Sequence, residues 1–176
     1  RITNNGKIRI KMSDWSSDPS ASNSGLQLFD TSGGSITSAA SVTSGSSHAV
    51  FLNPNGVCGT INTSGSSTQY NTSSDYRLKE NVVDLNGAIT RVKQLAPKRF
   101  NFITDADTIV DGFLAHEAQT VVPEAVTGSH NEVDENGDPV MQGIDQSKLV
   151  PLLTAALQEA IAKIETLEAQ VTALQG

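Results

Sequence analysis

The sequence predicts an α+β protein in which a β-rich segment, residues 1–73, precedes a small mixed domain, residues 74–176, ending in a long helix. Three observations predict this organisation. Ser, Thr and Gly dominate the first segment, where apolar residues occur only in short alternating islands. Conventional helix and strand signals begin after residue 74. Apolar residues then follow a heptad spacing over the last third of the second segment.

Composition limits the architecture and the function. With 176 residues and 5% aromatic side chains, one large core would be poorly supplied, so two unequal parts are expected. The single Cys58 excludes an internal disulfide framework and a cysteine-rich zinc site, which fits folding in the cytosol. No run approaches the roughly 18 apolar residues of a membrane span. Neither part has a basic stripe, and the net charge is −7, so we expect no nucleic-acid partner.

The first segment is expected to form short strands. Its apolar islands are Ile8, Ile10 and Met12, then Leu26 and Leu28, then Val50 and Leu52, then Val57 and Ile61. Strands with so few apolar residues cannot bury a core within one copy, so several chains should share one. A β-rich, trimeric fibre end is the natural solution. A disordered Ser/Thr linker is the alternative for the same composition.

The second segment opens with ordinary local signals. Apolar residues at helical spacing between Ala88 and Leu95 predict a short helix that Pro97 stops. Two strands are expected, one around Phe100 and Phe102 and one over the apolar run at residues 112–115. Asn136-Gly137, within residues 133–140, favours a hairpin turn, because its acidic neighbours lack the ligand pattern of an EF-hand.

The C-terminal residues 145–176 predict a coiled-coil helix. One heptad position holds Val150, Leu157, Ile164 and Val171, and the other holds Leu153, Ala160, Leu167 and Leu174. Pro151 is tolerated because it falls in the first helical turn. Branched residues at the first position with Leu at the second favour two strands, but further apolar residues widen the face. This periodicity leaves dimer and trimer open.

Ser74 and Lys79 form a candidate reactive pair at the junction of the two segments. A serine hydroxyl is a weak nucleophile until a neighbouring group takes its proton. A lysine can do so when burial or nearby cations lower its pKa toward neutrality. Spacing alone is weak support for catalysis, because Ser74 or Asp75 can equally cap a helical turn.

Three ordered blocks of sequence carry a family resemblance. They are residues 74–82 (SDYRLKENV), residues 112–117 with 122–126 (GFLAHE and VPEAV), and residues 143–145 with 149–153 (GID and LVPLL). Together they resemble the intramolecular chaperone domain found at the C-terminus of phage endosialidases, tailspikes and tail fibres. The resemblance covers the whole second segment, and residues 69–73 are similar to the fibre end that precedes such domains.

The resemblance implies an autoproteolytic serine peptidase that acts once on its own chain. The domain would form a homotrimer, align the upstream fibre chain as its folding client, and then cut itself off. Carried onto this sequence, Ser74 is the nucleophile, Lys79 the base, and the cut falls between Ser73 and Ser74. A backbone N–H or Arg77 is a candidate oxyanion donor. No cofactor or metal is implied.

Further polar residues could support the cleavage site. Asp75 and Arg77 lie inside the opening block, and His116 and Glu117 lie in the central block. His116-Glu117 also resembles half of a metalloprotease motif, but Thr120 stands where the second His would be, which disfavours zinc hydrolysis. His48 could meet its copies on a trimer axis, but a single His makes a metal site there weak.

The family context implies a location and leaves an alternative. The fibre would belong to the virion after assembly in the bacterial host cytoplasm, where the chaperone domain would be released. The alternative is a non-cleaving trimeric fibre tip that binds a bacterial surface receptor, with Trp15 as a loop contact. Three acids in the first segment, Asp14, Asp18 and Asp30, show no paired-carboxylate spacing, which disfavours a glycosidase.

Overall fold

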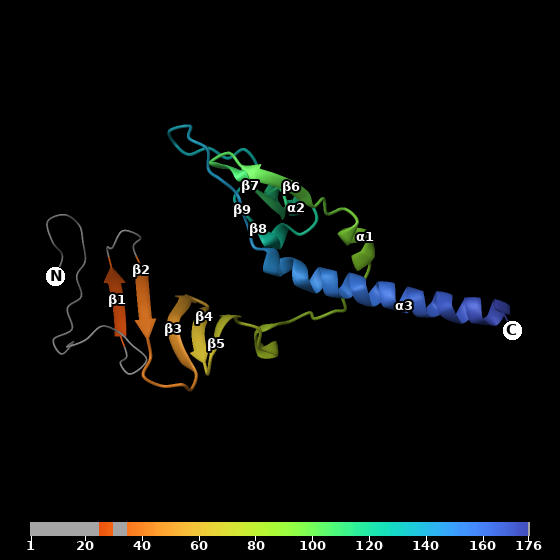
Figure 1. Cartoon of the computed structure of the whole chain (residues 1–176), viewed down its shortest axis with the longest axis horizontal. Coiled ribbons are helices and arrows are strands. Elements are labelled where there is room, and N and C mark those ends of the chain that lie inside the picture. The colour runs from red at the N-terminus through yellow and green to blue at the C-terminus, as the bar shows by residue number, and fades with distance from the viewer. Residues whose placement is uncertain (1–24, 30–34, 176) are drawn as a thin grey trace. The chain divides into compact units, whose positions relative to one another are not determined.

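The computed structural model describes residues 25–29 and 35–175, whose helices and strands are drawn in Figure 1. The chain divides into two compact units, Arg1–Asn81 and Val82–Gly176. Its mixed α+β content and long C-terminal helix confirm that part of the predicted fold class. The strand expected at Ile8, Ile10 and Met12, the Trp15 contact and the three acids Asp14, Asp18 and Asp30 lie outside the described residues.

In its described residues, the first unit contains two antiparallel sheets. Its strands are β1 (Gly25–Phe29) paired with β2 (Ser35–Ala39), and β3 (Ser46–Asn53), β4 (Gly56–Ser64) and β5 (Ser67–Thr72) paired in that order. The strands predicted at residues 26–28, 50–52 and 57–61 are confirmed. The sequence did not indicate β2 and β5, because each has a single large apolar or aromatic residue, Ile36 and Tyr70. Pairing with their neighbours, not hydrophobic alternation, defines these two strands.

The β3–β5 sheet exposes most of its large apolar side chains. Phe51 is 55% exposed and Tyr70 is 78% exposed, and Val50, Leu52 and Val57 are also exposed. Among the residues whose burial is described, every fully buried apolar side chain belongs to the second unit. A single copy of the first unit therefore buries little apolar surface in the described part.

The second unit has a small core formed mainly by helices. Its buried residues are Ala88, Val121, Val122, Ala125, Leu149, Leu152 and Ala156. They come from α1 (Ala88–Val92), the segment around η2 (Pro123–Ala125), η3 (Gln146–Leu149) and the start of α3 (Val150–Gln175). Figure 1 shows α1 beside α3, and each helix contributes a small buried residue to this core, Ala88 from α1 and Ala156 from α3. The helix predicted from Ala88 is confirmed, although regular α-helix ends at Val92.

The strand predicted over residues 112–115 is wrong. Strand β6 (Lys98–Phe102) is present as expected, but its partner β7 is Asp105–Gly112 and ends where the apolar run begins. Phe113 packs against the core, and α2 (Ala115–Gln119) follows. The carbonyl of Leu114 accepts hydrogen bonds from the N–H groups of Glu117 and Ala118, so helical bonds replace a strand ladder here.

A short sheet and a turn complete the unit. Strands β8 (Val126–Thr127) and β9 (Gly143–Ile144) pair across the predicted turn, where Val133 bridges Pro139. Gly137 has φ of 87°, the left-handed conformation that the Asn-Gly signal predicts, so the turn is confirmed. Asp145 caps η3 by accepting a hydrogen bond from Ser147 N, and α3 starts only at Val150. None of the described helices is long and apolar enough to span a membrane.

Candidate functional site

The candidate site begins where the chain leaves the β3–β5 sheet. The backbone N–H of Ser73 donates to the carbonyl of Cys58 at 3.0 Å, and its hydroxyl donates to the carbonyl of Val57 at 2.6 Å. These two bonds extend the β4–β5 pairing by one residue beyond the Gly59↔Thr72 pair. Strand β4 therefore holds the residue that precedes the predicted cut.

Gly59 allows β4 and β5 to approach closely just before this point. A Cβ added to Gly59 would lie 2.6 Å from the carbonyl oxygen of Asn71, a separation that real Cβ atoms essentially never show. Only glycine fits there without a shift of the backbone. Asn71 lies two residues before Ser73, so β4 and β5 are already close together where the hydrogen bonds of Ser73 to β4 begin.

A capped turn follows the sheet. Asp75 precedes η1 (Tyr76–Leu78), and its Oδ1 accepts a hydrogen bond of 2.9 Å from Arg77 N. The N–H of Leu78 donates to the carbonyl of Asp75, and that of Lys79 to the carbonyl of Tyr76. Aspartate is a favoured N-cap because its carboxylate pairs with the free N–H groups of a first turn. The capping role considered for Asp75 is thus present, and the turn folds Lys79 back toward Ser74.

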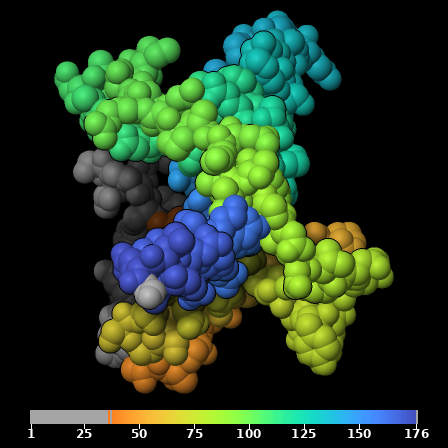
Figure 2. Space-filling model, turned by 90° about the vertical axis from the view of Figure 1, so that its right-hand side faces the viewer, coloured from red at the N-terminus to blue at the C-terminus, as the bar shows by residue number. Residues whose placement is uncertain are grey.

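Lys79 and Ser74 meet across this turn. Lys79 Nζ donates to Ser74 Oγ at 2.8 Å, so the structure brings together the two residues that the sequence singled out. Every residue from 71 to 87 is exposed in the single chain. The segment around η1, yellow-green in Figure 2, lies at the surface of the molecule. The pair is therefore formed locally and is open to solvent.

Arg77 is paired with Asp75. Its Nε and Nη2 donate to Asp75 Oδ1 and Oδ2 at 2.9 and 2.8 Å, a two-point contact between side chains that are 74% and 41% exposed. The Arg77 side chain, then its backbone N–H, and the charge of Lys79 hold the pKa of the Asp75 carboxyl below its ordinary value. In this geometry, Arg77 reinforces the cap of the turn.

His116 and Glu117 belong to α2 in the second unit. Glu117 Oε2 lies 3.2 Å from Lys98 Nζ, and the His116 ring stacks on the His130 ring with centroids 4.2 Å apart. Each therefore has a partner within its own unit. These contacts fit local packing of α2 on the β6 strand and on the loop after β8, and support of the cleavage site by this pair stays a prediction.

His48 has partners on both ring nitrogens. Nδ1 lies 2.8 Å from Ser38 Oγ, and Nε2 lies 2.9 Å from Thr63 Oγ1. These contacts connect β2, β3 and β4 in one chain. In the part of the chain that the structure describes, His, Cys, Asp and Glu side chains form no group of three that could hold a metal ion.

The anchoring of Ser73 is a feature that sequence reasoning missed. Its acceptors are the main-chain carbonyls of Val57 and Cys58, which no residue-type motif marks. The available signal was indirect: a glycine at position 59 in a strand, which indicates close approach of another backbone. It indicated neither the partner strand nor the register.

Residues 74–127 match the model of a peptidase family described as chaperone of endosialidase. The match begins at Ser74 and takes in η1, α1, β6, β7, α2, η2 and β8. It supports an endosialidase-type intramolecular chaperone domain in this chain, as the resemblance of the sequence blocks indicated. No curated protein matches the chain in a sequence search.

Proposed function

We propose that this chain is the C-terminal end of a phage tail fibre or tailspike whose chaperone domain cuts itself off between Ser73 and Ser74. Before the cut, the domain brings three chains together and aligns the upstream fibre segment, its folding client. One observation carries the proposal: Lys79 Nζ lies 2.8 Å from Ser74 Oγ, at the first residue of the family match. The contact between the two side chains and a family match that begins at Ser74 both support this proposal.

The reaction is an acyl transfer followed by hydrolysis. Ser74 Oγ attacks the carbonyl carbon of Ser73 while Lys79 takes the hydroxyl proton. The C–N bond between Ser73 and Ser74 breaks, and the proton passes to the nitrogen, which becomes an amine. The ester left between the Ser73 acyl group and Ser74 Oγ then reacts with water. The products are a fibre ending in a Ser73 carboxylate and a chaperone fragment starting at Ser74.

Local structure supports this chemistry on both sides of the bond. The hydrogen bonds from Ser73 to β4 fix the acyl side, and the Asp75-capped turn fixes the amine side. Pre-arranged reacting groups lower the entropic part of a barrier. The cut bond therefore lies between two anchored segments.

Assembly would change the environment of the pair. Lys79 donates a hydrogen bond to Ser74 here, whereas a base must accept the proton, so the reaction needs the uncharged amine. Tyr76 and Leu78, on the same turn, are 81% and 70% exposed in the single chain. A neighbouring chain that covers these apolar side chains would remove water from the amine and favour its uncharged form. In this way trimerisation would precede cleavage.

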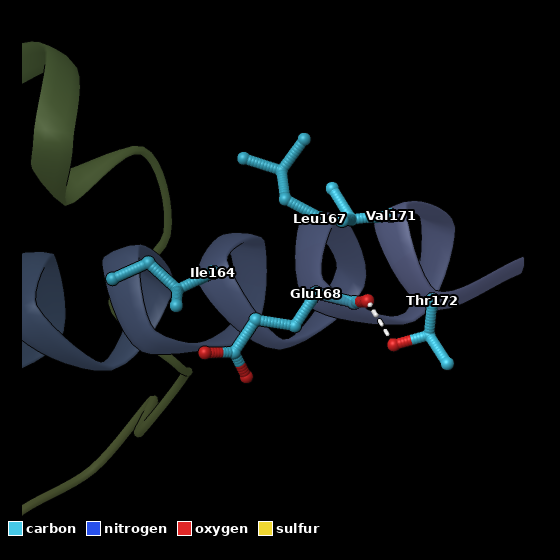
Figure 3. Close-up of a pocket in the computed structure, with 5 residues that line it drawn as sticks. All are labelled: Ile164, Leu167, Glu168, Val171 and Thr172. Atoms are coloured by element: carbon cyan, nitrogen blue, oxygen red, sulfur yellow. Dashed lines mark hydrogen bonds between the residues drawn. The ribbon is translucent and has the colours of Figure 1, made fainter. Parts of the chain in front are cut away.

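Helix α3 supplies the surface for oligomer formation. Ile164, Leu167 and Val171 are 53%, 58% and 51% exposed in the single chain, at successive heptad positions. They line a shallow hollow on the helix, and Leu167 and Val171 project from the same side in Figure 3. An uncovered apolar stripe of this length is typical of a helix that pairs with copies of itself. We take the oligomer to be a trimer because the resemblance to the phage chaperone domains implies a homotrimer.

Fragment mass tests the proposal. Wild-type chain should yield two fragments divided between Ser73 and Ser74, whereas Ser74→Ala and Lys79→Ala should stay intact. Ser129→Ala and Lys93→Ala, at exposed positions outside the turn, are matched controls that should cleave as wild type does. Cleavage that persists in both Ser74→Ala and Lys79→Ala would remove the proposed pair.

The alternative function is a trimeric, receptor-binding fibre tip that never cleaves. The full exposure of the Ser74–Lys79 turn in a single chain favours it, because the site of a peptide-bond cleavage normally excludes bulk water and this turn is open to it. Full-length chain in the wild type, with an assembled trimer, would support this alternative.

Under the main proposal, the fibre part belongs to the virion after assembly in the host cytoplasm, where the chaperone part is left behind.

A further inference from the structure

Ser73 is bonded to strand β4 through both its backbone and its side chain. Both its N–H and its hydroxyl donate to carbonyls of adjacent β4 residues, Cys58 at 3.0 Å and Val57 at 2.6 Å. The N–H bond fixes the backbone on β4, and the hydroxyl bond fixes the side-chain rotamer. Together they hold the residue that carries the carbonyl under attack.

These contacts exist only when β5 is paired with β4. Strand β5 is an edge strand whose residues are all exposed, so its pairing with β4 is what holds it in place. Gly59 and Asn71 set the close approach of the two strands just before Ser73. The hydrogen bonds that hold Ser73 therefore form only together with the pairing of β4 and β5.

We propose that Ser73 is a positioning residue that makes self-cleavage depend on completed pairing of β4 with β5. This inference rests on the proposed cleavage between Ser73 and Ser74. When the strands are unpaired, the Ser73 carbonyl moves freely relative to Ser74 Oγ, and productive attack is rare. When they pair, the carbonyl is held and attack proceeds. The chaperone domain is thus retained until the fibre segment next to it has folded.

The chain offers a matched control at the other end of the same strand. Ser67 Oγ donates to the carbonyl of Ser64 at 3.0 Å, the same type of hydroxyl-to-carbonyl bond, but far along the strand from the cut. Ser67→Ala removes this bond without touching Ser73. A purely structural role of strand-end hydroxyls predicts similar effects at both positions, whereas a positioning role predicts an effect at Ser73 alone.

The test is a pulse-chase measurement of the cleavage rate in cells expressing the full chain. Ser73→Ala removes one hydrogen bond, so we expect its cleavage rate to fall by between about threefold and tenfold. Ser73→Thr, which keeps the hydroxyl, and Ser67→Ala should both cleave within about twofold of wild type. Gly59→Ala should slow cleavage as well, because its Cβ would push Asn71 away.

A second measurement separates positioning from stability. The same changes are placed in a Ser74→Ala chain, which stays intact, and thermal unfolding is recorded. Ser73→Ala and Ser67→Ala should lower Tm by similar small amounts, while only Ser73→Ala slows cleavage. Wild-type cleavage rates in Ser73→Ala, or equal slowing by Ser67→Ala, would overturn the inference. If wild type itself never cleaves, the proposed function fails first and this inference fails with it.

Discussion

Glu159 of α3 caps the first helix of the second unit through the backbone of Ala88, 71 residues earlier in the chain. The carboxylate accepts hydrogen bonds of 2.8 Å from Ala88 N and 3.1 Å from Ile89 N. The N-cap residue Gly87 makes no side-chain cap bond, so Glu159 supplies what Ser or Asp would normally provide. Ala88 is 0% exposed, and the bond therefore joins α1 to α3 at the core.

Removing this cap should destabilise the second unit. Glu159→Ala leaves the N–H groups of Ala88 and Ile89 without their acceptor in a half-buried site, and Tm should fall by several degrees. Glu165→Ala, a change of the same type at an exposed position of α3, should leave Tm nearly unchanged. Thermal unfolding followed by circular dichroism checks both. Equal Tm values in the two variants would show that the cap contributes nothing.

The same contact predicts an acid sensitivity. Hydrogen bonds from Ile89 N and Ala88 N hold the pKa of Glu159 below its ordinary value of 4.5. Because the folded-state pKa is lowered, the stabilisation is present above pH 4.5 and is lost as pH falls through the folded-state value. Wild-type Tm should therefore fall more steeply below pH 4.5 than the Tm of Glu159→Gln. Parallel pH profiles would contradict this assignment.

Asp75 should matter for cleavage through its cap rather than through its charge. Asp75→Ala removes the acceptor of the Arg77 backbone N–H and the ion pair with the Arg77 guanidinium, so the turn that returns Lys79 to Ser74 is less populated and cleavage slows. Asp75→Asn keeps an acceptor for Arg77 N and should cleave at close to the wild-type rate. The two rates are compared by fragment mass over time. Equal slowing in both variants would assign the effect to the lost charge.

The apolar face of α3 should control assembly. Leu167→Glu places a charge on the exposed stripe and should convert trimers to monomers, whereas Ala169→Glu, at an exposed position off the heptad stripe, should not. Light scattering after size exclusion checks this on the uncut Ser74→Ala chain. We expect three times the chain mass of 18.5 kDa for Ser74→Ala and a single mass after Leu167→Glu. A twofold mass would show a dimer, and an unchanged mass in Leu167→Glu would exclude this face.

Local signals in the sequence account for much of the fold. The strands around Leu26, Val50 and Val57, helix α1, the turn at Gly137 and the terminal helix follow from alternation, helical spacing, Asn-Gly chemistry and heptads. Strands β2 and β5 do not follow from such signals. Each has few apolar side chains, and its pairing with a neighbouring strand defines it. The run at Phe113 indicated a strand, but Phe113 packs on the core and a helical turn follows.

Some features of the candidate site could be predicted from the sequence and others could not. Ser74 and Lys79 could be singled out because they lie in the opening block that resembles the chaperone family, and the Asp75-capped turn brings their side chains together. The anchoring of Ser73 could not, because its acceptors are main-chain carbonyls brought close by strand register. The Glu159 cap also depends on a contact between residues 71 positions apart, which no local pattern reveals.

The intact mass of freshly expressed wild-type chain, beside Ser74→Ala, tests the central claim most directly. We expect wild type to give two species whose masses correspond to residues 1–73 and 74–176, and Ser74→Ala to give one full-length species. Cleavage in water enriched in oxygen-18 should place the label in the new Ser73 carboxylate, as ester hydrolysis requires. A full-length wild-type chain within assembled trimers, or cleavage at another bond, would contradict the account.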